Sequence, residues 1–468
     1  MNNLNSIGLI GLGVMGRALS ENFLEKKISL SVYNRTTDGE EMVVSRFLKT
    51  NAEKKSLQGF GEFLPFVNSL KTPRNIILML PSGKVIDSVI NDLKPLLNPN
   101  DLIIDAGNSY FKDSIERGLD LKKTEIEFID CGVSGGKKGA RNGPSIMVGG
   151  SKDNYKRIKP FLKIISAKDE NKIECCAHMG SLGSGHFVKM VHNGIEYGEM
   201  QILSETFSIL NSQYNYPEIV SLFKKWSKKN LSSYLLDITM KIIEEEKPSG
   251  KHILDNIVDE ALAKGTGLWS SISGLNLGQS NSIMISAVIA RNLSSNKLMR
   301  KKNHIIRAHN KVPFVLKNTR KAFYMTKWIN HYQGFEMLRQ ANTVYKWNID
   351  LSETARIWTE GCIIKSALVK KISKILKQNE NLFETYSVFK KISKNEKFLK
   401  KTLRHSIKNG LPLLSYSAAH NYWLSYTSES SNANLIQAQR DYFGNHGYKK
   451  LDDNSNALHH YNWSNLSK

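Results

Sequence analysis

A glycine-rich loop near the start of the chain restricts the possible folds more than any other feature. Gly11, Gly13 and Gly16 have the spacing GxGxxG in IGLIGLGVMGRAL, between an apolar run and a segment with helical character. Glycines at this spacing allow a tight turn and a close approach of the backbone to a pyrophosphate. The N–H groups of the helix that begins near Val14 and Met15 can then bind the anion. The loop predicts a dinucleotide-binding site, and a glycine turn without a ligand is the alternative.

The first 180 residues alternate between short apolar runs and helix-length polar segments. The runs are rich in Ile, Leu and Val and read SIGLIG, SLSVYN, RNIILML, DLIIDAG and EFIDCG. Strands that alternate with helices are typical of a parallel, doubly wound sheet. The pattern predicts an α/β Rossmann-type N-terminal domain.

Apolar strand-like runs stop at about residue 181, and segments with helical periodicity follow. We expect helices at 183–212, 216–246, 251–263, 281–300, 314–347, 352–375, 395–409 and 415–428, with a break at Gly265-Thr266-Gly267. The last 30 residues are rich in Tyr, His and Asn and indicate an extended tail that needs a partner surface. The expected organisation is a Rossmann-like domain at 1–180, a large all-α domain at 181–438 and a C-terminal tail at 439–468.

Composition excludes several classes of protein. The chain has 468 residues, of which 40% are hydrophobic and 23% charged, and its apolar runs fall short of the roughly 18–20 residues of a membrane span. The N-terminus lacks the basic and apolar segments of a signal peptide. Cys131, Cys175, Cys176 and Cys362 form no CxxC pair. We therefore expect a cytoplasmic protein with no membrane contact and no zinc site.

The formal net charge of +23 is unusually high. A clustered positive charge would suggest a nucleic-acid surface, but the lysines are scattered along the chain. We therefore expect no nucleic-acid partner. A positive field would still attract an anionic substrate.

The second apolar run ends in VYNRT, where an NAD-binding domain normally carries an acidic residue for the ribose 2′-hydroxyl. Asn34, Arg35 and Thr36 stand there instead. A guanidinium can pair with a 2′-phosphate that a carboxylate would repel. These residues predict NADP as the cofactor, with Arg35 as the main discriminator; a surface arginine is the alternative.

The segment KMVHNGIEYG carries polar side chains at helical spacing. Lys189, His192, Asn193 and Glu196 occupy positions i, i+3, i+4 and i+7, so a helix would place them along one side. Such a stripe is either a solvated face or the lining of a pocket.

Several other segments place polar or small residues at strand or helix ends. Asn108 follows the fourth apolar run, and Ser134, Gly135 and Gly136 follow the fifth, where parallel sheets bind ligands. Further basic residues occur later in the chain, at Lys264, Arg291, Arg440 and His446. Each of these residues, taken alone, also has a purely structural explanation.

Nine motifs occur in order across most of the chain: GLGVMG, NRT, DAGN, GVSGG–GAR–GPSIMVGG, KMVHNGIEYGEMQ, KGTG, IARNLSS, ARIW–GCII and LIQAQRDYFGNH. On these motifs the chain resembles the 6-phosphogluconate dehydrogenase family, the decarboxylating enzymes of the oxidative pentose phosphate pathway. The similarity covers about 5–300 and 325–450. The resemblance implies a Rossmann-plus-helical fold and an obligate homodimer whose tails complete the partner's site.

The resemblance also implies roles for individual residues. Lys189 matches the general base and Glu196 the general acid. The positions that match substrate-binding residues are Asn108, Ser134, Gly135, Gly136, His192, Asn193, Tyr197, Lys264, Arg291, Arg440 and His446. The positions that match cofactor-binding residues are Gly11, Gly13, Val14, Met15, Gly16, Asn34, Arg35, Thr36 and Asn108.

The implied reaction is the oxidation of 6-phosphogluconate at C3, loss of CO2 from the resulting β-keto acid, and protonation to ribulose 5-phosphate. A lysine serves as the base if burial or nearby cations lower its pKa. No metal is expected, because the keto group itself is the electron sink.

Four positions depart from the family pattern. Lys137 and Lys138 replace two glutamates after GVSGG, Pro81 replaces a lysine in the loop after the third run, and Leu268 replaces a lysine after KGTG. These changes put the details of substrate affinity and adenosine binding in doubt.

Three competing hypotheses remain. A β-hydroxyacid dehydrogenase of the related short family shares the glycine loop and lysine helix, but lacks the long second half and leaves Lys264, Arg291 and Arg440 unexplained. A basic nucleic-acid binder would need clustered charge. A catalytically dead paralogue conflicts with the intact Lys189, Asn193 and Glu196.

Overall fold

The computed structural model describes residues 5–54, 56–228, 230–262, 265–305 and 313–463. The chain forms two compact units, Met1–Ala419 and His420–Lys468, which are described separately. Within the described ranges, every helix is too short or too polar to cross a lipid bilayer.

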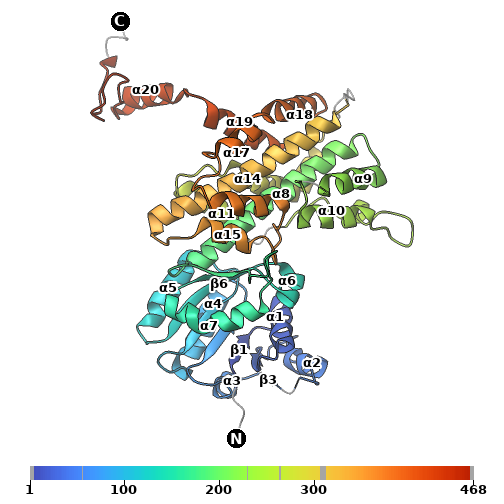
Figure 1. Cartoon of the computed structure of the whole chain (residues 1–468), viewed down its shortest axis with the longest axis vertical. Coiled ribbons are helices and arrows are strands. Elements are labelled where there is room, and N and C mark those ends of the chain that lie inside the picture. The colour runs from blue at the N-terminus through green and yellow to red at the C-terminus, as the bar shows by residue number, and fades with distance from the viewer. Residues whose placement is uncertain (1–4, 55, 229, 263–264, 306–312, 464–468) are drawn as a thin grey trace. The chain divides into compact units, whose positions relative to one another are not determined.

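The N-terminal half of the first unit contains one twisted sheet (Figure 1). Its described strands are β1 (Ile7–Ile10), β2 (Leu30–Tyr33), β3 (Leu57–Phe60), β4 (Asn75–Leu78), β5 (Leu102–Asp105), β6 (Glu127–Val133), β7 (Ile146–Gly149) and β8 (Cys176–Gly180). They are ordered β3-β2-β1-β4-β5-β6-β7-β8, and the direction of winding reverses between β1 and β4. All pairs are parallel except β6 with β7. The carboxyl end of β1 therefore lies at a topological switch point, where open α/β sheets bind ligands.

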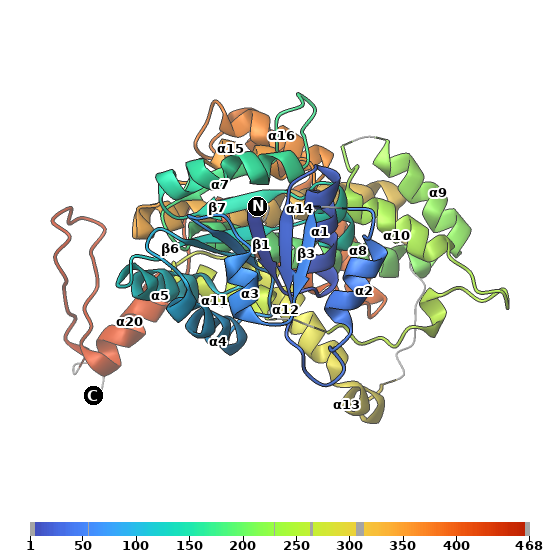
Figure 2. The same cartoon turned by 90° about the horizontal axis from the view of Figure 1, so that it is seen from below.

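Helices cover both faces of this sheet, as Figure 2 shows from below. They are α1 (Val14–Glu25), α2 (Val43–Thr50), α3 (Phe63–Asn68), α4 (Lys84–Leu93), α5 (Phe111–Lys122), α6 (Gly136–Asn142) and α7 (Lys152–Ile165). Apolar side chains of α1, α2 and α7, such as Phe23, Phe47 and Leu162, pack into one core with the strands. Side chains of α3, α4 and α5, including Phe66 and Ile90, form a second core on the opposite face. Two apolar faces explain why most strands are apolar throughout.

The five predicted strands are all present, but the prediction of a purely parallel sheet from five strands was incomplete. It missed β3, β7 and β8. β3 lies at an edge and is only partly buried, so its LQGF sequence lacks an apolar run. β8 carries a polar residue within CAHMG, His178, whose Nε2–H donates a hydrogen bond to the Gly150 carbonyl at 2.8 Å.

The rest of the first unit is helical. Its helices are α8 (Ser184–Asn211), α9 (Tyr216–Ser227), α10 (Tyr234–Glu244), α11 (Thr266–Asn276), α12 (Ser282–Ser295), α13 (Lys297–Lys302), α14 (Leu316–Tyr345), α15 (Leu351–Ile357), α16 (Ala367–Leu376), α17 (Tyr386–Ser393) and α18 (Glu396–Lys408); α19 (Leu414–Thr427) follows and extends past the unit boundary.

Several predicted helix boundaries were wrong. The segments 216–246, 281–300 and 352–375 each form two helices. The predicted helix 251–263 is wrong for the residues described there, which form only a short 3-10 turn at Leu254–Asn256. α11 and α17 were missed. Gly265, with φ +86°, precedes the first residue of α11, so the expected helix break marks the start of a helix.

The long helix α8 runs from the sheet into the helical layer (Figure 1). Glycines on both sides allow its first turns to lie directly against β6 and β7. A Cβ atom on Gly132 would lie 2.5 Å from the Cβ of Lys189, and one on Gly185 would lie 2.6 Å from the Gly149 nitrogen. The sheet therefore fixes the position of the Lys189 backbone.

Farther along α8, a buried ionic cluster joins this helix to α14. The carboxylate of Glu199 lies 2.8 Å from the Lys327 ammonium and 3.4 Å from Nδ1 of His331. All three side chains are at most 3% exposed. Asn330 of α14 also donates a hydrogen bond to the Ile195 carbonyl at 2.9 Å. These contacts hold the middle of α8 against a second rigid helix.

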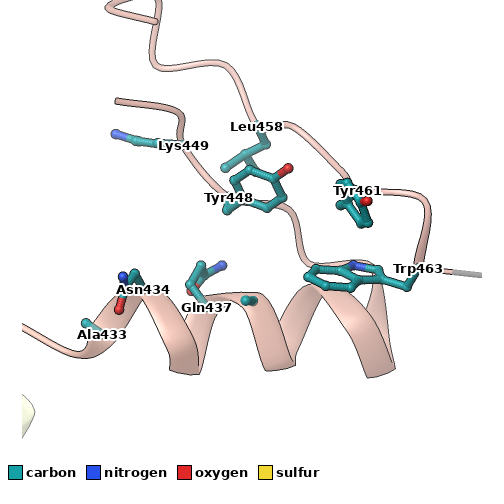
Figure 3. A pocket seen from close by; sticks show the side chains of 9 residues that line it. Ala433, Asn434, Gln437, Tyr448, Lys449, Leu458, Tyr461 and Trp463 are labelled. Atoms are coloured by element: carbon teal, nitrogen blue, oxygen red, sulfur yellow. The ribbon is translucent and has the colours of Figure 1, made fainter. Parts of the chain in front are cut away.

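The second unit contains α20 (Ala433–Gly444) and a segment folded back on it. The expectation of an extended tail from residue 439 is therefore wrong for its first residues, which are helical. Asp441 organises the unit: its carboxylate accepts hydrogen bonds from the Gly447 and Tyr461 backbone, from His460 and from the Trp463 indole. Tyr448, Tyr461 and Trp463 line a cavity of about 620 Å³ beside α20. Figure 3 shows these side chains next to the helix.

Candidate active site

The glycine loop between β1 and α1 has the geometry of an anion-binding turn. Gly11 has φ +100°, and a Cβ on Gly16 would lie 1.8 Å from the Gly11 carbonyl oxygen, so both positions exclude larger residues. A Cβ on Gly13 would instead enter open space. Gly13 is exposed and caps α1, whose first turn carries no acidic side chain. The N–H groups of Val14 and Met15, in the first turn of α1, therefore face a space that a phosphate can enter. The residues of this loop fit a dinucleotide.

The side chains after β2 extend this site. The Asn34 amide oxygen accepts a hydrogen bond from the Leu12 N–H at 3.0 Å, which ties this turn to the glycine loop. Arg35 is largely exposed and pairs with Glu40 at 3.1 Å. Thr36 is exposed beside Gly61. Asn34 and Arg35 together form a cradle for an anion, and the Glu40 carboxylate occupies it.

The polar stripe on α8 is mostly buried, so it is not a solvated helix face. Lys189 is 6% exposed, His192 0% and Asn193 8%. The Lys189 amine donates hydrogen bonds to the Ser134 hydroxyl at 3.2 Å and to the Asn193 amide oxygen at 2.8 Å. β6 ends at Val133, directly before Ser134, and Gly132 of this strand packs against Lys189 of α8, which brings Ser134 to this cluster.

His192 closes a hydrogen-bonded ring with the same partners. Its Nε2 lies 3.1 Å from the Ser134 hydroxyl, and its Nδ1 lies 3.2 Å from the Asn193 oxygen. Burial and the nearby Lys189 lower the pKa of His192 well below its usual value, so the ring is neutral. One assignment satisfies every contact: Nδ1–H donates to Asn193, and the Ser134 hydroxyl donates to Nε2. The Trp358 ring packs edge-on against this imidazole.

The pKa values of Lys189 and Glu196 shift in opposite directions, and burial is the main cause of both shifts. Burial lowers the pKa of Lys189, and the Glu196 charge opposes this effect. Burial raises the pKa of Glu196, against the effects of Lys189 and Arg291. Two groups whose pKa values move toward neutrality, seven residues apart on one helix, suit acid and base chemistry. Glu196 remains 23% exposed at its side chain and lies 3.7 Å from Nδ1 of His192.

An arginine packs on Tyr197, the residue that follows Glu196 on α8. The Arg291 guanidinium of α12 stacks on the Tyr197 ring at 3.5 Å. It also donates a hydrogen bond to the Leu262 carbonyl at 3.3 Å. A Cβ on Gly267 would lie 2.4 Å from the Tyr197 ring, so the KGTG motif needs a glycine here. The arrangement presents a positive group that can bind an anionic end of a ligand.

The residues Gly135 and Gly136 shape the loop after β6. Both have positive φ values, +101° and +58°. A Cβ on Gly135 would lie 2.6 Å from the Gly361 carbonyl oxygen, so this loop packs closely on the GCII segment. The Ser134 N–H donates a hydrogen bond to the Ser145 carbonyl at 3.0 Å, which helps to fix its position.

Four other positions were predicted to bind the substrate, and the structure describes three of them, Asn108, Arg440 and His446. Asn108 is exposed after β5, and two residues on, the Tyr110 ring lies 5.4 Å from Trp269 of α11. Lys264 falls outside the described residues. In the C-terminal unit, Arg440 lies on α20 and contacts the Gln437 side chain, and His446 follows that helix. The four departing positions, Pro81, Lys137, Lys138 and Leu268, are all exposed.

Sequence reasoning missed Asp130, which lies inside an apolar strand. Its two carboxylate oxygens accept hydrogen bonds from the N–H groups of Gly183 and His186, each at 2.7 Å. These groups begin α8, so β6 supplies the cap that the helix lacks locally. Burial raises the pKa of this fully enclosed carboxyl, and the two N–H groups oppose the shift. Its separation of more than 50 residues from its partners leaves no local sequence pattern.

Comparisons with known proteins agree with this geometry. Residues 6–180 match the NAD binding domain of 6-phosphogluconate dehydrogenase, and residues 185–463 match its C-terminal domain. Decarboxylating 6-phosphogluconate dehydrogenases of Buchnera aphidicola from Schizaphis graminum and of Escherichia coli K12 are 42% and 39% identical to this chain, with 98% of each chain covered. The solved 6-phosphogluconate dehydrogenase of Plasmodium falciparum matches with a TM-score of 0.90 at 34% identity, over 98% of this chain and 100% of that one.

The Rossmann-type sheet, the glycine loop and the buried lysine on a long helix define a dinucleotide-dependent oxidoreductase fold. The two family matches together span most of the chain. The chain belongs to the 6-phosphogluconate dehydrogenase family.

Proposed function

We propose that the chain catalyses the oxidative decarboxylation of 6-phosphogluconate to ribulose 5-phosphate and CO2, with NADP as the oxidant, in the pentose phosphate pathway. The family membership and the names of relatives along the full chain support this activity. The Plasmodium falciparum relative is described in complexes with NADP+ and with 6-phosphogluconate.

The cofactor is held by the glycine loop and by the turn after β2. Gly11, Gly13 and Gly16 let the pyrophosphate approach the start of α1 near Val14 and Met15. The 2′-phosphate binds at Asn34, Arg35 and Thr36, and Asn108 lies by the nicotinamide. When bound, NADP accepts the hydride that leaves C3 of the substrate.

Lys189 removes the C3 hydroxyl proton as the hydride departs. A neutral amine has two hydrogens, and the contacts to Ser134 and Asn193 use both of them. Its lone pair is then left to accept the substrate proton. The lowered pKa of Lys189 increases the neutral fraction that this step requires. Afterwards, the protonated Lys189 donates a hydrogen bond to the new ketone.

Glu196 supplies the proton for the last step. Loss of CO2 from the β-keto carboxylate leaves an enediolate, whose negative charge is stabilised by the hydrogen bond from protonated Lys189. The protonated carboxyl of Glu196 then protonates the carbon that lost CO2. Its raised pKa keeps more of it in the acid form. Lys189 and Glu196 are roughly 10.5 Å apart along the helix axis, so their long side chains can approach different parts of a short sugar chain.

Two different sets of residues bind the two ends of the substrate. Ser134, Gly135, Gly136, His192 and Asn193 surround the sugar acid, and Tyr197, Lys264 and Arg291 bind the phosphate. The stacking of the half-buried Arg291 guanidinium on the Tyr197 ring supports the latter role. A phosphate dianion favours several cations at one site.

We further propose that the enzyme is a homodimer in which Arg440 and His446 complete the partner's site. The C-terminal unit supports this role because it exposes large apolar side chains, with Phe443 73% and Tyr461 52% exposed. The corresponding functional parts are the cofactor domain at 1–180, the substrate and dimerisation domain at 181–438 and the tail at 439–468.

The single observation that carries the proposal is the buried Lys189, bonded to Ser134 and Asn193 in a family whose named relatives decarboxylate 6-phosphogluconate. The test mixes purified protein with 6-phosphogluconate and NADP and follows both reduced nicotinamide and CO2. Equal amounts of the two products are expected. Reduction without CO2, or activity on non-phosphorylated β-hydroxyacids alone, would favour the alternative of a β-hydroxyacid dehydrogenase.

A further inference from the structure

The side chains that would bind the 2′-phosphate of NADP already hold an anion from the chain itself. Nε of Arg35 donates to the Glu40 carboxylate at 3.1 Å, and Nη2 donates to its other oxygen at 3.5 Å. The Asn34 amide donates to the same carboxylate at 3.1 Å. Glu40 thus accepts hydrogen bonds from two nitrogens of the Arg35 guanidinium and from the amide of Asn34.

These contacts bear on the cofactor because they lie at the dinucleotide loop. The opposite end of the Asn34 side chain accepts the hydrogen bond from Leu12 of that loop. Arg35 also lowers the pKa of the Glu40 carboxyl, so this group is ionised at neutral pH. An ionised carboxylate at this position repels a 2′-phosphate, whereas it can accept a hydrogen bond from a ribose 2′-hydroxyl.

We propose that Glu40 is a specificity-determining residue that weakens the preference of this enzyme for NADP over NAD. It competes with the 2′-phosphate for Asn34 and Arg35, and it offers the 2′-hydroxyl of NAD an acceptor. The inference rests on the proposed function only in that a nicotinamide dinucleotide binds at the glycine loop.

The strength of the competition is limited by solvent. The side chains of Arg35 and Glu40 are 63% and 38% exposed, and exposed ion pairs are weak. Glu40 therefore shifts the preference without abolishing NADP binding. Removal of its charge is expected to change the ratio of the two dissociation constants by roughly three- to tenfold.

The chain offers a matched control in the adjacent residue. Glu41 carries the same charge and is exposed. Its carboxylate accepts a hydrogen bond from the Gly39 N–H at 3.0 Å, away from the guanidinium. Glu41→Gln removes the same net charge as Glu40→Gln while the Arg35 and Glu40 pair stays intact.

Calorimetric titration of the full-length protein with NADP and with NAD tests the proposal without any turnover. Glu40→Gln is expected to tighten NADP relative to NAD by roughly three- to tenfold, and Glu41→Gln by less than about twofold. An unchanged ratio in Glu40→Gln, or an equal shift in both variants, would overturn the proposal. Failure of the wild-type protein to bind either dinucleotide would instead contradict the proposed function.

Discussion

The carboxylate of Asp130 on β6 accepts a hydrogen bond from the His186 N–H at 2.7 Å, so the sheet holds the first turn of the helix that carries Lys189. The same carboxylate binds the Gly183 N–H. Because both N–H groups are enclosed, Asp130→Ala leaves two donors without an acceptor and is expected to lower the free energy of unfolding by about 2 kcal/mol. Urea unfolding checks this value.

Asp130→Asn provides the matched control for that prediction. It retains one acceptor oxygen of similar shape, so we expect a smaller loss of stability than for Asp130→Ala. Turnover should follow the same order, because displacement of the first turn of α8 moves Lys189. An Asp130→Ala protein as stable and as active as the wild type would contradict the role of Asp130 as a cap.

The pH dependence of turnover should depend on Lys189 and Glu196. The mechanism needs Lys189 neutral and Glu196 protonated. The rate therefore falls at low pH as Lys189 gains a proton and at high pH as Glu196 loses one. Because burial lowers the pKa of Lys189 and raises that of Glu196, the low-pH limb lies below the usual lysine value of 10.5 and the high-pH limb above the usual glutamate value of 4.5.

Glu196→Gln separates the two limbs. It keeps the shape of the side chain but carries no titrating proton, so turnover should fall by roughly 10²–10⁴-fold and the limb that belongs to Glu196 should disappear. Glu196→Asp, which keeps an acid, should preserve that limb. A complete pH–rate profile in both variants decides the matter, and a high-pH limb unaltered in Glu196→Gln would count against the acid role.

Arg35→Ala should weaken NADP far more than NAD, because only NADP carries the phosphate that pairs with a guanidinium. We expect a loss of roughly tenfold or more in NADP affinity. Arg46→Ala is the control, since Arg46 is another exposed arginine, on α2. Calorimetry with both cofactors gives the ratio directly. An equal loss for NADP and NAD would reject Arg35 as the 2′-phosphate ligand.

A chain cut after residue 438 should bind NADP but lack turnover, because it loses Arg440 and His446. The single variant Arg440→Ala should lower activity as well, and Lys450→Ala, also exposed in the tail, should not. Mixed dimers of Lys189→Ala and Arg440→Ala subunits test whether the tail acts across the dimer. Recovered activity in the mixture supports the exchange, whereas a fully active truncated chain would refute it.

Local patterns were sufficient for part of the fold and of the site. The glycine loop and the apolar runs predicted β1, β2, β4, β5 and β6, because each signal lies within a few neighbouring residues. The predicted helix 183–212 is confirmed by α8. Its spacing placed Lys189 near Asn193 and His192 near Glu196, and the structure brings both pairs into contact.

The remainder depends on contacts between distant segments. The edge strand β3 needs no apolar run because one side of it is partly solvated. The sequence gives no reason for Asp130 in an apolar strand, because its hydrogen-bond partners, the N–H groups of Gly183 and His186, come from the start of α8. Likewise, the buried ion pair of Glu199 and Lys327 forms only because α8 and α14 pack together, so neither helix predicts it alone. Glu40 needed the turn geometry that folds it back onto Arg35.

Turnover of Lys189 variants with 6-phosphogluconate and NADP tests the central claim most directly. Lys189→Ala removes the base, and Lys189→Arg keeps a cation that cannot give up its proton. We predict that both substitutions lower the rates of NADPH and CO2 formation by roughly 10²–10⁴-fold while the affinity for NADP is retained. Turnover close to that of the wild type in either variant would contradict the account.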